Sequence, residues 1–215
     1  MTERRKSKLH RAVSNAAEKL QNSYLGREDN PASEAAARGV LAELRRHTGQ
    51  RPEKAPLAFE KALSYVYPVL LDETADSYAT YDEEAAFHAL TLFALHMQSA
   101  TQPMHTDKRS FARACGLMYA HGESESLKPR FDAVLTANSY ESQLYHVRSL
   151  VTLLRAKDLG FDYGAFAQDL KTLQGSKFAN SVLLSWGRDF ASAPFVKNNN
   201  DKSEKVNTSD SHSNS

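Results

Sequence analysis

The chain has 215 residues, of which 41% are hydrophobic and 25% are charged, and its formal net charge is +1. A chain of this length and composition can bury a hydrophobic core as one domain or as two small ones. A net charge this close to zero is not that of a strongly basic nucleic-acid binder, so a nucleic-acid function would depend on where the charges lie.

The single cysteine, Cys115, excludes an intramolecular disulfide framework and a zinc site built on cysteines. No apolar run approaches the roughly 20 residues of a membrane span. The basic start MTERRKSKLHR is followed by polar helix formers rather than by the apolar core of a signal peptide. We therefore expect a soluble, cytoplasmic protein that does not contact a membrane.

The first third of the chain predicts three amphipathic helices, because Pro and Gly are sparse and separate intervals rich in Ala, Leu, Glu, Lys and Arg. Apolar residues recur at helical spacing over 9–24. A second helix begins near Pro31 and ends before Gly49, and a third begins after Pro56 and is interrupted by Pro68.

The segment DEEAAFHALTLFALHMQS predicts a fourth, deeply buried helix with Asp82 as its N-cap. Ser110 begins a fifth, which ends at the HGES break. Apolar residues at helical spacing mark four more helices, over 131–135, 144–154, 166–173 and 182–190. The sequence thus predicts an all-α, compact bundle of roughly eight to nine helices, with Phe93, Leu150, Leu154 and Trp186 in its core.

We assign residues 1–196 to this helical domain, either as one unit or as an N-terminal and a C-terminal half that divide near 100–110. The last stretch, 197–215, has almost no apolar residues. Such a segment buries too little surface to offset its chain entropy, so we predict a disordered tail.

No pattern in the sequence indicates catalysis, a metal site or a cofactor. His88 and His96 are eight positions apart on one predicted helix, whereas metal-binding helices place ligands three or four apart. Cys115 lies on the apolar stripe of its helix, which is typical of a core residue rather than a reactive thiolate. We therefore expect a protein that is not an enzyme.

Cationic side chains flank the core face of several predicted helices. Arg45 and Arg46 end the second helix, Arg113 lies in the first turn of the fifth, and Lys128, Arg130 and Arg148 follow on the next two. One interpretation is that these are solvated charges, with Arg45 and Arg46 complementing a helix C-terminus. The other is that the helices bring them together into a groove that binds a phosphate backbone.

Four segments in this order resemble one family: LAELRRHTG, SFARACGLMYAHGE, the stretch 127–173 that begins LKPRF, and WGRDF. Together they are similar to the small subunit (CasB type) of the bacterial type I-E CRISPR interference complex, Cascade. The similarity extends from about Leu9 to Phe190 and is densest over 110–186.

The resemblance implies a non-catalytic, all-helical subunit of an RNA-guided antiviral surveillance complex, present in two copies and lying between the guide RNA backbone and the large subunit. Its implied partners are the large and backbone subunits, the guide RNA, the displaced single-stranded DNA and a second copy of itself. In that family, basic residues stabilise the displaced non-target strand of the R-loop.

Matched by motif, the family's basic positions fall on Arg45, Arg46, Arg113, Arg130 and Arg148 of this chain, with Lys128 close by. The chain departs from the family pattern at three places. It has Lys128-Pro129-Arg130 where consecutive arginines stand, Thr136 where some members have arginine, and Ser149 where the second arginine of a pair stands. The resemblance therefore implies a less positive groove here.

Two other functions remain open on the sequence alone, besides an unrecognised helical hydrolase. A helix-turn-helix transcription regulator needs a tight turn before its recognition helix, whereas QNSYLGREDNPASE forms a longer break that contains a proline. A helical protein-interaction adapter without nucleic-acid contact would not need the arginines. Binding to duplex DNA by the isolated chain would indicate the regulator.

Overall fold

A computed structural model of the chain describes residues 6–70, 79–122, 124–175 and 177–195. Along these residues it contains nine α-helices: α1 (Lys8–Tyr24), α2 (Pro31–Arg46), α3 (Pro56–Val66), α4 (Tyr81–His96), α5 (Phe111–Ala120), α6 (Leu127–Thr136), α7 (Tyr140–Arg155), α8 (Tyr163–Gln174) and α9 (Ala179–Ser192). The described residues carry no regular strand, so the all-α prediction is confirmed. The predicted tail, 197–215, lies outside the described residues.

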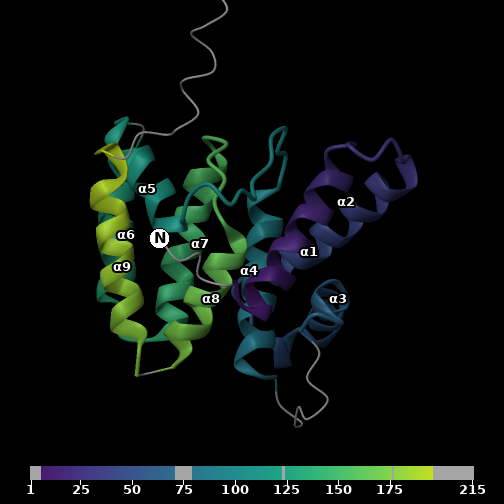
Figure 1. Cartoon of the computed structure of the whole chain (residues 1–215), viewed down its shortest axis with the longest axis horizontal. Helices are drawn as coiled ribbons and strands as arrows, with labels where there is room; N and C mark the ends of the chain where they lie inside the picture. The colour runs from purple at the N-terminus through teal and green to yellow at the C-terminus, as the bar shows by residue number, and fades with distance from the viewer. Residues whose placement is uncertain (1–5, 71–78, 123, 176, 196–215) are drawn as a thin grey trace, which may run out of the picture.

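The helices form two groups that meet at α4 and α8 (Figure 1). In the view of Figure 1, α1, α2 and α3 lie to the right, and α5, α6, α7 and α9 lie to the left. α8 packs against both α4 and α1, whereas α5 packs on α9 and α6 packs on α7. The C-terminal half of the chain is thereby joined to its first helix.

Side-chain caps fix where the helices begin. Ser110 caps α5 as predicted, since its hydroxyl accepts a hydrogen bond from the backbone N–H of Arg113 at 3.2 Å. The prediction that Asp82 caps α4 was wrong. The cap is Thr80, whose hydroxyl accepts from the N–H of Glu83 at 3.2 Å while the Glu83 carboxylate accepts from the N–H of Thr80 at 2.8 Å. This reciprocal capping box satisfies two helix donors and so outcompetes a single aspartate.

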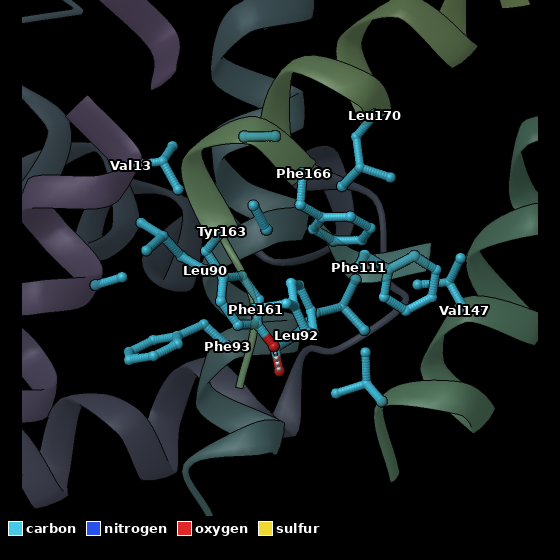
Figure 2. Close-up of a cluster of buried hydrophobic side chains, with 14 of the residues drawn as sticks. Val13, Leu90, Leu92, Phe93, Phe111, Val147, Phe161, Tyr163, Phe166 and Leu170 are labelled. Carbon is cyan, nitrogen blue, oxygen red and sulfur yellow. Dashed lines mark hydrogen bonds between the residues drawn. The ribbon is translucent and has the colours of Figure 1, made fainter. Parts of the chain in front are cut away.

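The core is built around α4, in which every residue from 85 to 96 is buried. Aromatic rings from three parts of the chain meet there, as Figure 2 shows. Phe161 and Tyr163 stack with ring centroids 4.3 Å apart, and Phe111 meets Phe161 edge-on at 5.3 Å. The four residues predicted for the core are all buried, namely Phe93, Leu150, Leu154 and Trp186.

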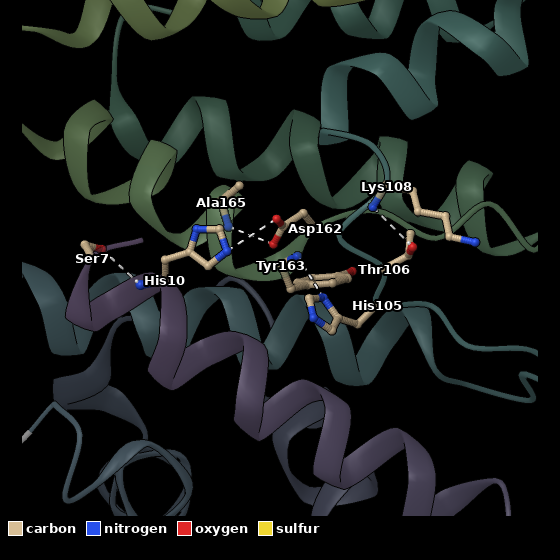
Figure 3. Close-up of polar contacts among 8 residues, drawn as sticks. All are labelled: Ser7, His10, His105, Thr106, Lys108, Asp162, Tyr163 and Ala165. Atoms are coloured by element: carbon tan, nitrogen blue, oxygen red, sulfur yellow. Dashed lines mark hydrogen bonds and ion pairs between the residues drawn. The ribbon is translucent and has the colours of Figure 1, made fainter. Parts of the chain in front are cut away.

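Polar contacts attach α1 to the start of α8 (Figure 3). Asp162 caps α8 by accepting from the N–H of Ala165 at 3.0 Å, and its other oxygen lies 3.4 Å from Nε2 of His10 on α1. Further along α1, the Gln21 amide donates to the carbonyl of His105 at 3.2 Å and accepts from its N–H at 2.9 Å. Both ends of α1 are therefore held by residues far away in the sequence.

His96 on α4 should make the stability of the fold depend on pH. Its Nδ1 lies 3.0 Å from the Tyr163 hydroxyl, and burial, followed by the positive charge of Arg155, lowers the pKa of His96 from 6.5 to about 3. Above pH 6.5 the contribution of this residue to the free energy of unfolding is complete. It is lost as the pH falls, because the unfolded chain then binds a proton that the folded chain excludes. The loss should reach about 1.4 kcal/mol per pH unit between about pH 6 and 4.

Denaturant unfolding of the wild type and of His96→Asn at several pH values checks this expectation. The asparagine amide can still bond with the Tyr163 hydroxyl but does not titrate. The free energy of unfolding of the wild type should fall more steeply with decreasing pH than that of the variant. The buried carboxyl of Asp169, whose pKa burial raises to about 6, contributes to both proteins and cancels in the comparison. Equal slopes would contradict the assignment.

Candidate nucleic-acid interface

The end of α2 is fixed to the core by Thr48, a buried residue just beyond the helix. Its hydroxyl lies 2.8 Å from the carbonyl of Arg45 and 3.0 Å from the carbonyl of Thr91 on α4. Arg45 is half-buried and Arg46 is exposed in the last turn of α2, where positive charge also complements the helix dipole. The arginine pair therefore stands at a rigid point of the surface.

Arginines from two other helices lie along the same part of the surface. Arg148, exposed on α7, donates from Nη1 to the carbonyl of Thr48 at 3.4 Å, which links α7 to the end of α2. Arg130, exposed on α6, donates from Nη1 to the hydroxyl of Ser149, the residue that follows Arg148. We call four cations on these helices the arginine strip: Arg45 and Arg46 at the end of α2, Arg148 on α7 and Arg130 on α6. Thr48 links Arg148 to the end of α2 and Ser149 links Arg130 to α7, whereas Arg46 borders a separate hollow beside Lys54 and Pro56.

The hydrogen bonds that orient the strip leave its positive charge in place. Arg148 donates to a carbonyl and Arg130 donates to a hydroxyl, and neither acceptor carries a charge. Some other cations of the described residues do pair with carboxylates, as in Arg38–Glu34, Arg51–Glu141 and Lys171–Asp82. The strip therefore contributes positive charge to the surface of a chain whose net charge is only +1.

The other two predicted cations have different surroundings. The ammonium of Lys128 lies 2.5 and 2.7 Å from the two oxygens of Asp132, so a carboxylate one turn away already balances its charge. Arg113 is half-buried in the first turn of α5, and its positive charge contributes, after burial, to lowering the pKa of Arg109. Because the Ser110 hydroxyl contacts Asp189 at 2.5 Å, this end of α5 lies against α9.

Two residues that sequence reasoning missed orient the strip. Thr48 accepts from Arg148 across 100 positions of the chain. Ser149 accepts from Arg130 and stands where the resemblance implied a lost arginine. Ser149 lacks the positive charge of the arginine that it replaces. It also accepts the hydrogen bond that holds Arg130 close to Arg148. The departure from the family pattern at Ser149 was the signal that could have drawn attention to it.

The described residues contain no group of three or more His, Cys, Asp or Glu side chains that could hold a metal ion. His88 and His96 are both buried in α4. Cys115 is fully buried, and burial raises the pKa of its thiol, so it lacks thiolate character. Among the described helices, none is long and apolar enough to span a bilayer.

A model of the family described as CRISPR-associated protein Cse2 matches residues 40–190 of the chain. None of the curated proteins matches it. Among solved structures, CasB from Thermobifida fusca is similar with a TM-score of 0.64 and 28% identity, over 86% of this chain and 98% of that one.

Two further structures, each under 25% identical, share the fold. A Cse2-family CRISPR-associated protein from Thermus thermophilus gives a TM-score of 0.57 at 23% identity, over 84% of this chain and 98% of that one. A chain of a CRISPR RNA-guided surveillance complex gives 0.57 at 19% identity, over 84% of this chain and 94% of that one. The similarity spans nearly the full length of each of these proteins.

Proposed function

Because the chain belongs to the CRISPR-associated Cse2 family, we propose that it is a non-catalytic subunit of an RNA-guided surveillance complex in the cytoplasm. The match over 40–190 covers most of the chain, and one protein with this fold is part of a CRISPR RNA-guided surveillance complex. The partners that we propose are the large and backbone subunits, the guide RNA, the displaced DNA strand and a second copy of the chain.

The role that we propose within the complex is to hold the displaced single strand of the R-loop by its phosphates. The observation that carries this proposal is the arginine strip. Arg148 bonds with the loop that follows Arg45 and Arg46, Arg130 bonds with the residue after Arg148, and the acceptors of both hydrogen bonds are uncharged. Arginine contacts to phosphates position a strand but do not read its sequence. Sequence recognition then belongs to base pairing with the guide.

Holding the displaced strand matters because R-loop formation is a nearly balanced exchange of one duplex for another. A modest free energy from phosphate contacts is enough to shift that balance. Near-neutral total charge fits such a subunit, because a strongly basic surface elsewhere would bind nucleic acid indiscriminately. Of the remaining predicted cations, Arg113 would contact the backbone at the end of α5, and Lys128 could do so only by leaving Asp132.

Purification of the tagged chain from its native host, followed by sequencing of the RNA that accompanies it, tests the proposal. We expect short RNAs of uniform length with constant ends around variable middles, together with several partner proteins. An untagged strain provides the background. Recovery of the chain alone, from cells shown to express a guide locus, would overturn the proposal and favour the regulator or the adapter.

A further inference from the structure

A small hollow opens beside the arginine strip, and the phosphate contacts do not account for it. It lies between the loop after α2, helix α4 and helix α7, and its volume is about 110 Å³. Arg148 of the strip forms part of its rim, together with the ion pair between Arg51 and Glu141. A strand held by Arg148 would therefore pass directly over the opening.

Two tyrosines and a leucine form the apolar part of the walls of the hollow. Leu144 and Tyr140 line it from α7, and Tyr140 is held in place by the Gln174 amide, which donates to its hydroxyl at 3.3 Å. The ring of His88 meets Tyr140 edge-on, with centroids 5.8 Å apart. At the rim, 72% of Tyr145 is exposed, and its ring meets that of His146 edge-on, with centroids 5.3 Å apart. Such rings are platforms on which nucleobases stack.

The floor contains a buried polar group whose nearest polar contact is long. His88 is only 2% exposed, and its Nε2 forms no hydrogen bond among the described residues. The nearest carboxylate oxygen, Oε1 of Glu84, lies 3.5 Å away, beyond a good hydrogen bond. A closer acceptor would therefore satisfy this imidazole better than Glu84 does.

We propose that this hollow receives one unpaired, pyrimidine-sized base of the strand that the arginine strip holds, an inference that rests on the proposed function. The volume of about 110 Å³ is below the roughly 150 Å³ of an engineered cavity that accepts a benzene ring, so the hollow admits part of one base ring and is too small for a purine. Tyr145 and Leu144 pack on its faces, and Arg148 binds the adjoining phosphate.

The polar floor complements the edge of such a base. Pyrimidine bases present a hydrogen-bond donor next to an acceptor on their pairing edge, which is free in a displaced strand. The Glu84 carboxylate only accepts, whereas the His88 imidazole can donate from Nε2. The two groups belong to one helix and lie 3.5 Å apart, so the floor offers a donor and an acceptor side by side. The base would thus give His88 a closer partner than Glu84.

Dissociation of a displaced strand from the assembled complex tests the inference. The DNA target is a duplex in which the displaced strand is already unpaired from its complement. That strand carries thymidines, adenosines or abasic sites. From the wild-type complex, the thymidine strand should dissociate about tenfold more slowly than the abasic strand, which is within the range for base stacking on aromatic side chains. The adenosine strand should gain less than the thymidine strand.

The variants Tyr145→Ala and Glu84→Gln should each bring the thymidine rate toward the abasic rate and leave the abasic rate unchanged. Tyr81→Ala is the matched control, because Tyr81 is another exposed tyrosine, at the start of α4, and does not itself line the hollow. Equal rates for thymidine and abasic strands in the wild type would overturn the inference. So would a thymidine advantage that survives in both variants, or an equal advantage for adenosines.

The same assay separates this inference from the proposed function. Charge reversal in the arginine strip should speed dissociation of the abasic strand, which has phosphates but no bases. If it does so while thymidines bring no advantage, the phosphate role stands and the base site is wrong. If charge reversal leaves the abasic strand unaffected while the hollow variants remove a thymidine advantage, the base site stands and the phosphate role is wrong.

Discussion

Reversing the charge of Arg45, Arg130 and Arg148 together should lower the equilibrium yield of R-loops by about 10- to 100-fold in the assembled complex. Each arginine would lose a phosphate contact worth about 0.5 to 1 kcal/mol at an exposed site, and each new carboxylate would repel the strand. All three side chains reach the surface and none lies in the core, so the variant should fold and join the complex.

The salt dependence of the yield is the sharper measurement. Each phosphate contact on a single strand contributes roughly 0.7 to the slope of log affinity against log salt, so losing three contacts should reduce the slope by about 2. The matched control is Arg11→Glu/Lys19→Glu/Arg188→Glu, which makes the same change in net charge at exposed positions on α1 and α9. A wild-type yield and slope in the strip variant would show that the arginines do not contact the strand.

The helices could be predicted from the sequence because their signals are local. Apolar spacing located α1, α2 and α3, and Pro56 and Ser110 marked where two helices begin. The N-cap of α4 was misassigned because Asp82 and Thr80 are both acceptable caps, and the choice depends on whether Glu83 can reach back to the first N–H. When two nearby residues are both acceptable N-caps, sequence rules alone do not show which of them caps the helix.

The arrangement of the candidate site could be predicted only in part. The sequence and the family resemblance indicated which cations to consider, but not how they are grouped. Arg148 lies beside the end of α2 because of Thr48, and Arg130 lies beside Arg148 because of Ser149. These contacts join residues that are far apart in sequence, which no local pattern encodes. The Asp132 carboxylate, which takes up the charge of Lys128, lies only four positions away on the same helix, so this pair could have been predicted from the sequence.

The role of His88 at the floor of the hollow could not be predicted from the sequence either. His88 was considered for metal binding because of its spacing from His96, and that spacing argued against a metal. What distinguishes His88 is the packing of Tyr140 of α7 against its ring, because its other neighbour, Glu84, lies one turn away on the same helix. A histidine in an apolar run gives no indication of whether its buried nitrogen finds a partner. Only the packing of α7 over α4 reveals that Nε2 does not.

Replacing Gly116 or Gly164 by alanine should destabilise the fold severely, because each glycine lets two helices touch. A Cβ at Gly116 on α5 would lie 2.3 Å from the carbonyl oxygen of Phe190 on α9. A Cβ at Gly164 on α8 would lie 2.5 Å from the carbonyl oxygen of His10 on α1. Backbone atoms cannot rotate away, so each helix pair must separate, at about 3 kcal/mol for each substitution. For a chain of this size, Tm should fall by about 6 to 12 °C.

The same substitution at Gly187 on α9 is the matched control. A Cβ there would meet nothing within 4 Å, so alanine should only improve helix propensity and raise Tm slightly, by about 2 °C. Thermal unfolding of the three variants therefore separates close helix contact from the general effect of glycine in a helix. Because Gly116 and Gly164 lie in different helix pairs, their effects should add in the double variant. Higher Tm values for Gly116→Ala and Gly164→Ala would mean that these helices do not pack at the distances described.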